Sequence, residues 1–142
     1  MKRMVPAWLL CIVAAAAAAD WRPAAISDQS TIEILTVVPP EGEHWSTVWF
    51  TVIDGTAYVR LGSRARKRIE ASTMAPRTKV RTADGVVHAM RYEQAPELAD
   101  KIASAMYEKY WSDVLGEPFR KLGLTAPPLM LRLLPANESS GP

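Results

Sequence analysis

Alternating β-branched and aromatic residues mark the middle of the chain as two strand pairs. The segments TVWFTVI (47–53) and TAYVRL (56–61) flank Asp54-Gly55, and the segments at 77–83 and 86–92 flank Asp84-Gly85. Asp-Gly between two such segments is a strong hairpin signal, because both central residues of a type I′ turn need a positive φ. The pattern therefore predicts two antiparallel hairpins, each closed by a type I′ turn.

Two more segments have the pattern of strands. The run TIEILTVV at 31–38 is rich in β-branched residues and ends at Pro39-Pro40, after which Glu41 to Trp45 is expected to be a polar loop. Near the C-terminus, the alternate leucines of LMLRLL at 129–134 fall on one face. Six strands are therefore expected, which places the chain in a mainly β, α+β class.

The clearest helix is expected to begin at Pro96, in the segment PELADKIASAMYEKYW. Its apolar residues recur at steps of four, and this stripe should pack over the sheet. They are Leu98, Ile102, Met106 and Tyr110. A shorter helix is expected over 63–72, with Ser63 as its N-cap, and residues 119–122 suggest one brief helical turn.

Adjacent aromatic residues in the first hairpin must point to opposite faces of the sheet. Trp49 and Phe50 follow one another in a strand, so one should be buried in the core while the other lies under a helix or at a dimer contact. In the partner strand, Tyr58 and Arg60 share the face opposite the aliphatic residues. His88 is expected on the less buried face of its strand.

The N-terminus has the pattern of a secretory signal peptide. Lys2 and Arg3 precede an apolar run, and three alanines ending at Ala19 precede Asp20. The run is shorter than the roughly 20 residues that a membrane-spanning helix needs. We therefore expect cleavage after residue 19 and export to the periplasm or the medium, which leaves a lead-in at 20–30, one domain at 31–135 and a disordered tail at 136–142.

Charge and cysteine content narrow the classes of function. The chain has 17 basic and 15 acidic residues, and loss of Lys2 and Arg3 with the signal leaves 15 of each. A neutral chain does not indicate nucleic-acid binding or attraction to a membrane after cleavage. Loss of Cys11, the single cysteine, excludes thiol catalysis and disulfides, and the two histidines, His44 and His88, lack partners for a metal site.

Basic residues are concentrated from Arg60 to Arg81, that is, from the end of the first hairpin into the second. Eight cations in this segment face one acid, Glu70; they are Arg60, Arg64, Arg66, Lys67, Arg68, Arg77, Lys79 and Arg81. Arginine matches phosphate with two parallel hydrogen bonds, and a helix start at Gly62-Ser63 offers backbone N–H groups. The segment is therefore either a site for a small anionic ligand or a solvated basic face, and the residues leave both interpretations open.

The order of these elements resembles a known family. A strand ending in a basic residue, a short helix rich in serine and arginine, and a second hairpin followed by a long helix look like the pyridoxamine 5′-phosphate oxidase-like flavin-binding split barrels. The resemblance is closest to a short branch that is also compared with deazaflavin-dependent nitroreductases. It covers about 31–135 and is most specific over VWFTVIDGTAYVRLGSRARKRIEAS.

The resemblance implies a six-stranded antiparallel split β-barrel with one long and one or two short helices, which forms a homodimer around two cofactor sites. By position, it makes Arg60, Ser63, Arg64 and Lys67 candidates for contact with the phosphate of FMN or a deazaflavin, and Trp49 a candidate beside the ring. The implied function is that of an oxidoreductase, which the signal peptide would make an exported one and for which the isolated histidines predict no metal. The alternative is a non-catalytic exported domain that has lost the cofactor and binds an anionic ligand or partner.

Overall fold

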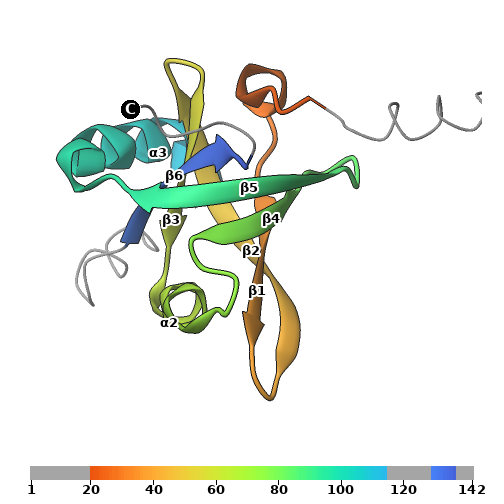
Figure 1. Ribbon diagram of the computed structural model, residues 1–142. Helices are drawn as coiled ribbons and strands as arrows, with labels where there is room; N and C mark the ends of the chain where they lie inside the picture. The colour runs from red at the N-terminus through yellow and green to blue at the C-terminus, as the bar shows by residue number, and fades with distance from the viewer. Residues whose placement is uncertain (1–19, 115–128, 137–142) are drawn as a thin grey trace, which may run out of the picture.

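Six antiparallel strands close into a barrel in the computed structural model, which describes residues 20–114 and 129–136 (Figure 1). The strands are β1 (Ile32–Val38), β2 (Gly42–Ile53), β3 (Thr56–Leu61), β4 (Arg77–Arg81), β5 (Val87–Gln94) and β6 (Leu129–Pro135). Around the barrel they follow the order β1-β2-β3-β6-β5-β4, with β1 and β4 closing the ring. The predicted fold class is confirmed.

In the described part of the chain, two α-helices and two short 3-10 helices accompany the barrel. The 3-10 helix η2 (Pro23–Ile26) precedes β1, and α2 (Ser63–Ala71) links β3 to β4. A 3-10 turn, η3 (Pro96–Leu98), leads into α3 (Ala99–Val114), which lies between β5 and β6 in the sequence. Figure 1 shows α2 at one end of the barrel and α3 along its side. The lead-in at 20–30 therefore contains one helical turn.

The barrel interior is filled by alternate residues of all six strands. Val48, Phe50 and Val59 are at most 5% exposed, and Ile69 of α2 packs against the same cluster. The cluster also contains Ile32, Ile34, Ala57, Leu61, Val80, Met90, Leu131 and Leu133. Inward-facing residues of neighbouring strands meet because side chains alternate along each strand with a period of two.

Helix α3 covers the outer face of the barrel with the predicted apolar stripe. Ile102, Met106 and Tyr110 are buried against Tyr58 of β3 and Met130 of β6. Trp49 packs against this second cluster, whereas the adjacent Phe50 is fully buried inside the barrel. The expected division of the two aromatic residues between opposite faces is therefore confirmed.

Only the first Asp-Gly turn has the predicted conformation. Asp54 and Gly55 have φ of 50° and 77°, as a type I′ turn requires. At the second turn Gly85 has a positive φ of 85° but Asp84 does not. There the carboxylate of Asp84 accepts hydrogen bonds from the Thr82 hydroxyl and the Val86 N–H, and these local bonds hold a wider loop between β4 and β5.

Two other local predictions are wrong. The expected loop at Glu41 to Trp45 is mostly strand, because Gly42, with φ of 82°, turns the chain tightly enough for β2 to pair back onto β1 from Val38 onward. His88 is half-buried between the exposed Val87 and Ala89, on the same side of β5 as the buried Met90. An edge-on contact with the indole of Trp21, 5.1 Å between centroids, holds it there.

Three predictions lie outside the described residues: the signal peptide at 1–19, the helical turn at 119–122 and all but the first residue of the tail at 136–142. Within the described part of the chain, no helix combines the length and apolar character needed to span a membrane.

Candidate functional site

Trp49 and Arg60 lie directly opposite each other on β2 and β3. Both point away from the barrel interior, since Val48, Phe50, Val59 and Leu61 on either side of them fill the core. Arg60 is the last outward-facing residue of β3, and α2 begins only three residues later. The strand end therefore places an indole and a guanidinium next to a helix N-terminus.

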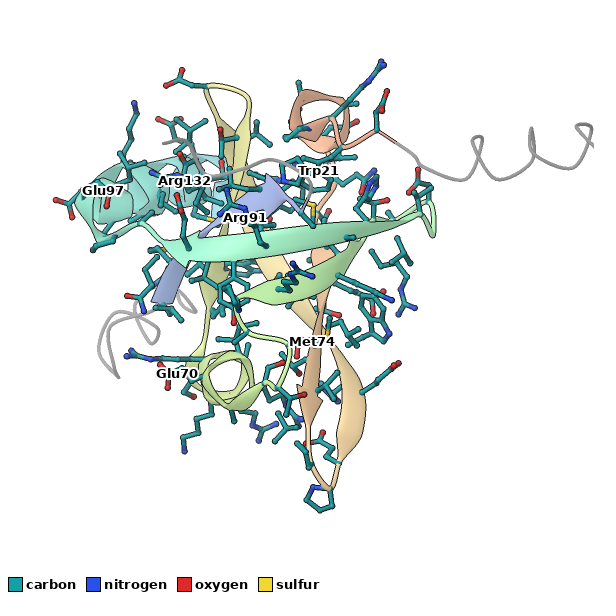
Figure 2. The ribbon with its side chains drawn as sticks, in the orientation of Figure 1. Trp21, Glu70, Met74, Arg91, Glu97 and Arg132 are labelled. Carbon is teal, nitrogen blue, oxygen red and sulfur yellow. The ribbon has the colours of Figure 1, made fainter. Side chains whose placement is uncertain are left out.

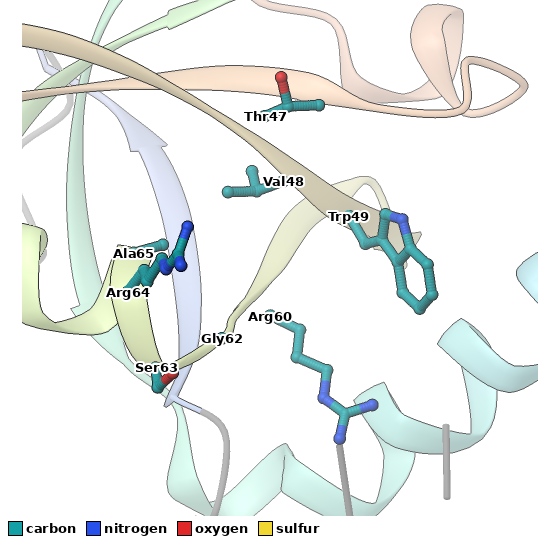
Figure 3. A pocket seen from close by; sticks show the side chains of 8 residues that line it. All are labelled: Thr47, Val48, Trp49, Arg60, Gly62, Ser63, Arg64 and Ala65. Atoms are coloured by element: carbon teal, nitrogen blue, oxygen red, sulfur yellow. The ribbon is translucent and has the colours of Figure 1, made fainter. Parts of the chain in front are cut away.

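A cavity of about 420 Å³ opens between these elements. Its lining comes from residues 47–49 of β2, Arg60 of β3 and residues 62–65 at the start of α2 (Figure 3). Four of the five predicted site residues line it, namely Trp49, Arg60, Ser63 and Arg64. This volume is within the range of small-molecule sites in proteins.

The start of α2 has no side-chain cap. The N-cap is Gly62, with φ of −71° and ψ of 177°, and not Ser63 as predicted; no side chain caps the helix and its first turn holds no acid. The first hydrogen bond within the helix runs from the Arg66 N–H to the Gly62 carbonyl, at 2.8 Å. The backbone N–H groups of the preceding residues are therefore directed out of the helix start, where an anion can accept from them.

Arg60 lines the cavity from β3. Its side chain extends from β3 toward α3 (Figure 3), and burial lowers the pKa of its guanidinium. A lowered pKa means that the charged form has lost part of its hydration. An anion that enters the cavity would lie close to this cation, and the attraction between them is stronger in a partly desolvated site.

The other basic residues divide into paired and exposed groups. Arg66 bonds Glu70 at 2.8 Å, Arg68 bonds Glu41, and Arg81 bonds both carboxylate oxygens of Glu33 at 2.9 and 3.0 Å. Lys67 is exposed on α2 and does not line the cavity, although it was a predicted site residue. Arg77 and Lys79 are exposed on β4. The cationic segment is thus not one site, and only Arg60 and Arg64 of its eight cations reach the cavity.

Tyr110 of α3 holds Trp49 in place, a role that the sequence did not reveal. The two rings stack with centroids 4.6 Å apart and planes 12° from parallel. The Tyr110 hydroxyl accepts from the Phe50 N–H at 3.1 Å and lies 2.6 Å from the Ser30 carbonyl oxygen, to which it can donate. The sequence indicated Tyr110 only as part of the apolar stripe of a helix.

Metal-ligating groups do not gather in the described part of the chain. Residues 20–114 and 129–136 contain no group of three or more histidine, cysteine, aspartate or glutamate side chains that could hold an ion. Neither His44 nor His88 lines the cavity.

Comparison with known proteins gives a fold match without a sequence match. No protein-family model and no curated protein sequence matches the chain. Among solved structures, HutZ, the heme storage protein of Vibrio cholerae, superposes with a TM-score of 0.58 at 16% identity, covering 78% of this chain and 84% of its own.

Two further structures give similar values. The conserved hypothetical protein Rv2991 of Mycobacterium tuberculosis matches with a TM-score of 0.53 at 16% identity, covering 83% of this chain and 82% of its own. ChuZ of Campylobacter jejuni matches with a TM-score of 0.55 at 7% identity, covering 88% of this chain and 58% of its own. The chain therefore has the split-barrel fold of the pyridoxamine 5′-phosphate oxidase-like proteins, as the resemblance predicted.

Proposed function

We propose that this chain binds a flavin or deazaflavin through its phosphate and acts as an oxidoreductase. The observation that carries the proposal is the combination, in one cavity, of an uncapped helix start, Arg60 and Arg64 with the indole of Trp49. A flavin nucleotide has a phosphate group at one end, which matches the basic helix start, and a flat ring system at the other, which matches the indole.

The phosphate end of the ligand fits the start of α2. The Ser63 hydroxyl, the outward backbone N–H groups of the first turn and the Arg64 guanidinium are all hydrogen-bond donors at this point. A dianionic phosphate here also removes the unfavourable interaction between the helix dipole and the cations of the first two turns. The residues at the start of α2 therefore fit a phosphate group.

The ring end fits the surface between Trp49 and Arg60. Tyr110 stacks on Trp49 and so fixes the orientation of the indole that flanks the cavity. A guanidinium beside a flavin ring favours negative charge on that ring, and Arg60 is the cation positioned to do so. A bound flavin supplies hydride transfer, while the protein supplies orientation and electrostatics.

Heme is a second candidate, since HutZ is a heme storage protein with the same fold. Protein groups that ligate heme iron are histidine, cysteine, methionine and tyrosine. Among the described residues none of these lines the cavity, where the lining side chains are threonine, valine, tryptophan, arginine, serine and alanine, together with one glycine. The chemistry of the lining therefore favours a flavin.

Export and self-association belong to the same proposal. We infer from the N-terminal pattern that the mature protein begins near Asp20 and functions outside the cytoplasm, and from the resemblance that it is a homodimer. The intact mass of the exported protein tests the cleavage site, and light scattering of the mature protein tests the dimer.

Titration of the mature protein with FMN, followed by quenching of flavin fluorescence, tests the proposal. Binding is expected at micromolar concentration, and Arg64→Ala is expected to weaken it about 10- to 100-fold, the cost of one charge-assisted hydrogen bond. Lys67→Ala is the matched control, because Lys67 lies on the same helix outside the cavity; its affinity should stay within about twofold.

Three other outcomes overturn the flavin proposal. A protein that binds neither FMN nor a deazaflavin at low salt is not a flavoprotein, and an anionic ligand that binds with the same dependence on Arg64 identifies it as a non-catalytic binding domain. A Soret band on titration with hemin, in the absence of FMN binding, supports heme. Equal loss of FMN binding in Arg64→Ala and Lys67→Ala points to general charge attraction.

A further inference from the structure

A second cavity adjoins the first and shares Arg60 with it. It has a volume of about 470 Å³, and its other lining residues, Ala103, Ser104, Tyr107 and Glu108, all come from α3. They form two adjacent pairs, Ala103-Ser104 and Tyr107-Glu108, four residues apart, and so lie on one side of the helix. This stripe is distinct from the buried stripe of Ile102, Met106 and Tyr110 that packs on the barrel.

The residues around this second cavity differ in chemistry. Arg60 contributes a cation whose pKa is lowered by burial, so a carboxylate that meets it gains a charge-assisted hydrogen bond. Tyr107 is 43% exposed and, with Val87, is one of two large hydrophobic residues exposed in the described part of the chain. Its ring offers a flat face for stacking.

Two of the other lining residues, Ser104 and Glu108, have side chains that accept hydrogen bonds. Glu108 and Ser104 are both exposed, and Glu108 lies four residues after Ser104, next to Tyr107. A carboxylate oxygen of Glu108 accepts from a hydroxyl or amine group and repels a second carboxylate. The cavity therefore presents a cation, an aromatic ring and an anion within one helix stripe and the adjoining strand end.

We propose that this second cavity binds a small aromatic carboxylate that also carries a hydroxyl group. The carboxylate pairs with Arg60, the ring stacks on Tyr107, and the hydroxyl donates to Glu108. The binding site stands on the α3 cavity alone, and only its coupling to a cofactor in the first cavity rests on the proposed function.

The shared arginine links the two cavities. A ligand in the first cavity and a carboxylate in the second both contact one guanidinium, whose donors are arranged in a planar fork. Two ligands on the same residue are thermodynamically coupled, and each changes the affinity of the other by the same factor. The affinity for the aromatic acid should therefore change when FMN is bound.

Calorimetric titration with three related probes tests the site in the mature protein without added flavin. 4-Hydroxybenzoate should bind at least threefold more tightly than benzoate, which lacks the hydroxyl, and than phenol, which lacks the carboxylate. Tyr107→Ala should weaken 4-hydroxybenzoate by roughly 3- to 10-fold, as expected for loss of one aromatic stacking contact, whereas Tyr107→Phe should retain the affinity.

Glu108→Ala should remove the preference for 4-hydroxybenzoate over benzoate. Glu43→Ala is its control, because Glu43 is an exposed acid on β2 outside both cavities. Circular dichroism confirms that each variant is folded, and FMN titration of the Tyr107 and Glu108 variants separates this site from the first.

The outcomes of the two proposals are distinguishable. Binding of the aromatic acid without binding of FMN supports this site and overturns the flavin proposal, and the reverse result overturns only this site. Equal affinity for all three probes overturns the inference. It is also overturned if wild type binds no probe and Tyr107→Ala changes the protein from dimer to monomer, because the α3 stripe is then a subunit contact.

Discussion

The indole of Trp49 stacks on the phenol ring of Tyr110, with centroids 4.6 Å apart and planes 12° from parallel. The stack joins β2 to α3 on the outside of the barrel, at the edge of the cavity that we propose as the cofactor site. The same tyrosine hydroxyl bonds the backbone of Phe50 and lies within reach of Ser30. One residue therefore connects the helix, the strand and the segment before β1.

Removal of the Tyr110 hydroxyl should destabilise the barrel. Tyr110→Phe keeps the stack but leaves the Phe50 N–H, now bonded at 3.1 Å, without this acceptor. Loss of a buried partner costs about 1 to 3 kcal/mol in the free energy of unfolding, and Tyr110→Ala, which also removes the ring, about 3 to 5 kcal/mol. Urea denaturation followed by circular dichroism measures both.

Tyr107→Phe is the matched control on the same helix. Tyr107 is 43% exposed, so removal of its hydroxyl should lower the free energy of unfolding less than removal of the buried Tyr110 hydroxyl does. If Tyr110→Phe proves as stable as Tyr107→Phe, the hydroxyl of Tyr110 does not hold β2 as described.

Lys109 should make stability depend on pH in the alkaline range. Its ammonium lies 3.5 Å from the Phe50 ring centroid and donates to the Phe50 carbonyl at 3.0 Å, and burial lowers its pKa to about 8, against a smaller opposing effect of Asp28. An unfolded lysine titrates near pH 10.4, so between about pH 8 and pH 10.4 the unfolded chain binds more protons than the folded one. The free energy of unfolding contributed by this residue therefore rises with pH across that window.

Comparison with Lys109→Met isolates this effect, because other titrating groups are common to both proteins. The difference in free energy of unfolding between wild type and variant should shift in favour of wild type from pH 7 to pH 10. A difference that stays constant over that range means that Lys109 is not desolvated in the folded protein.

Gly62→Asp should change stability and ligand binding in opposite directions. Gly62 has the extended backbone of an N-cap, and nothing lies within 4 Å of the position that a Cβ would take. An aspartate there caps the helix and opposes the cations of α2, which should raise the free energy of unfolding by about 0.5 to 1 kcal/mol. The same carboxylate occupies the N–H groups proposed for phosphate and repels it, so FMN affinity should fall more than tenfold.

Thermal unfolding and FMN titration of the same preparation measure the two effects. A Gly62→Asp variant that is more stable and still binds FMN as well as wild type contradicts the placement of the phosphate at α2. Gly55→Ala is a useful contrast, since φ is 77° at that turn and a side chain there should cost about 1 to 2 kcal/mol without affecting FMN.

Local sequence patterns predicted most of the fold because the spacing of apolar residues differs between strands and helices and can be read from the sequence. The alternation around Trp49 and Phe50 and the four-residue steps of α3 both gave the correct buried faces. The second Asp-Gly turn was mispredicted because the side chain of Asp84 bonds Thr82 and Val86 and so stabilises a wider loop. The dipeptide alone does not reveal this competition.

The site was harder to predict, because charge density in a sequence does not show which cations point to one place. Arg66 and Arg68 are as basic as Arg64, but each meets an acid. Glu70 lies four residues after Arg66 on the same helix, whereas only the folded chain brings Glu41 near Arg68. Lys67 is on the same helix as Arg64 but is not among the residues that line the cavity.

The ion pairs of Arg132 were also not predictable from the sequence, because they join residues far apart in the chain. Arg132 bonds Glu93 at 2.6 Å and Glu97 at 3.0 Å, a contact between β6, β5 and the turn before α3 that no short motif encodes (Figure 2).

The affinity ratio of FMN to riboflavin, measured for wild type and Arg64→Ala, tests the central claim most directly, because the two ligands differ only in the phosphate. We predict that wild type binds FMN about tenfold or more tightly than riboflavin, and that the ratio falls toward one in Arg64→Ala while riboflavin affinity is unchanged. Equal binding of the two ligands by wild type, or a ratio that Arg64→Ala leaves intact, would contradict a phosphate site at the start of α2.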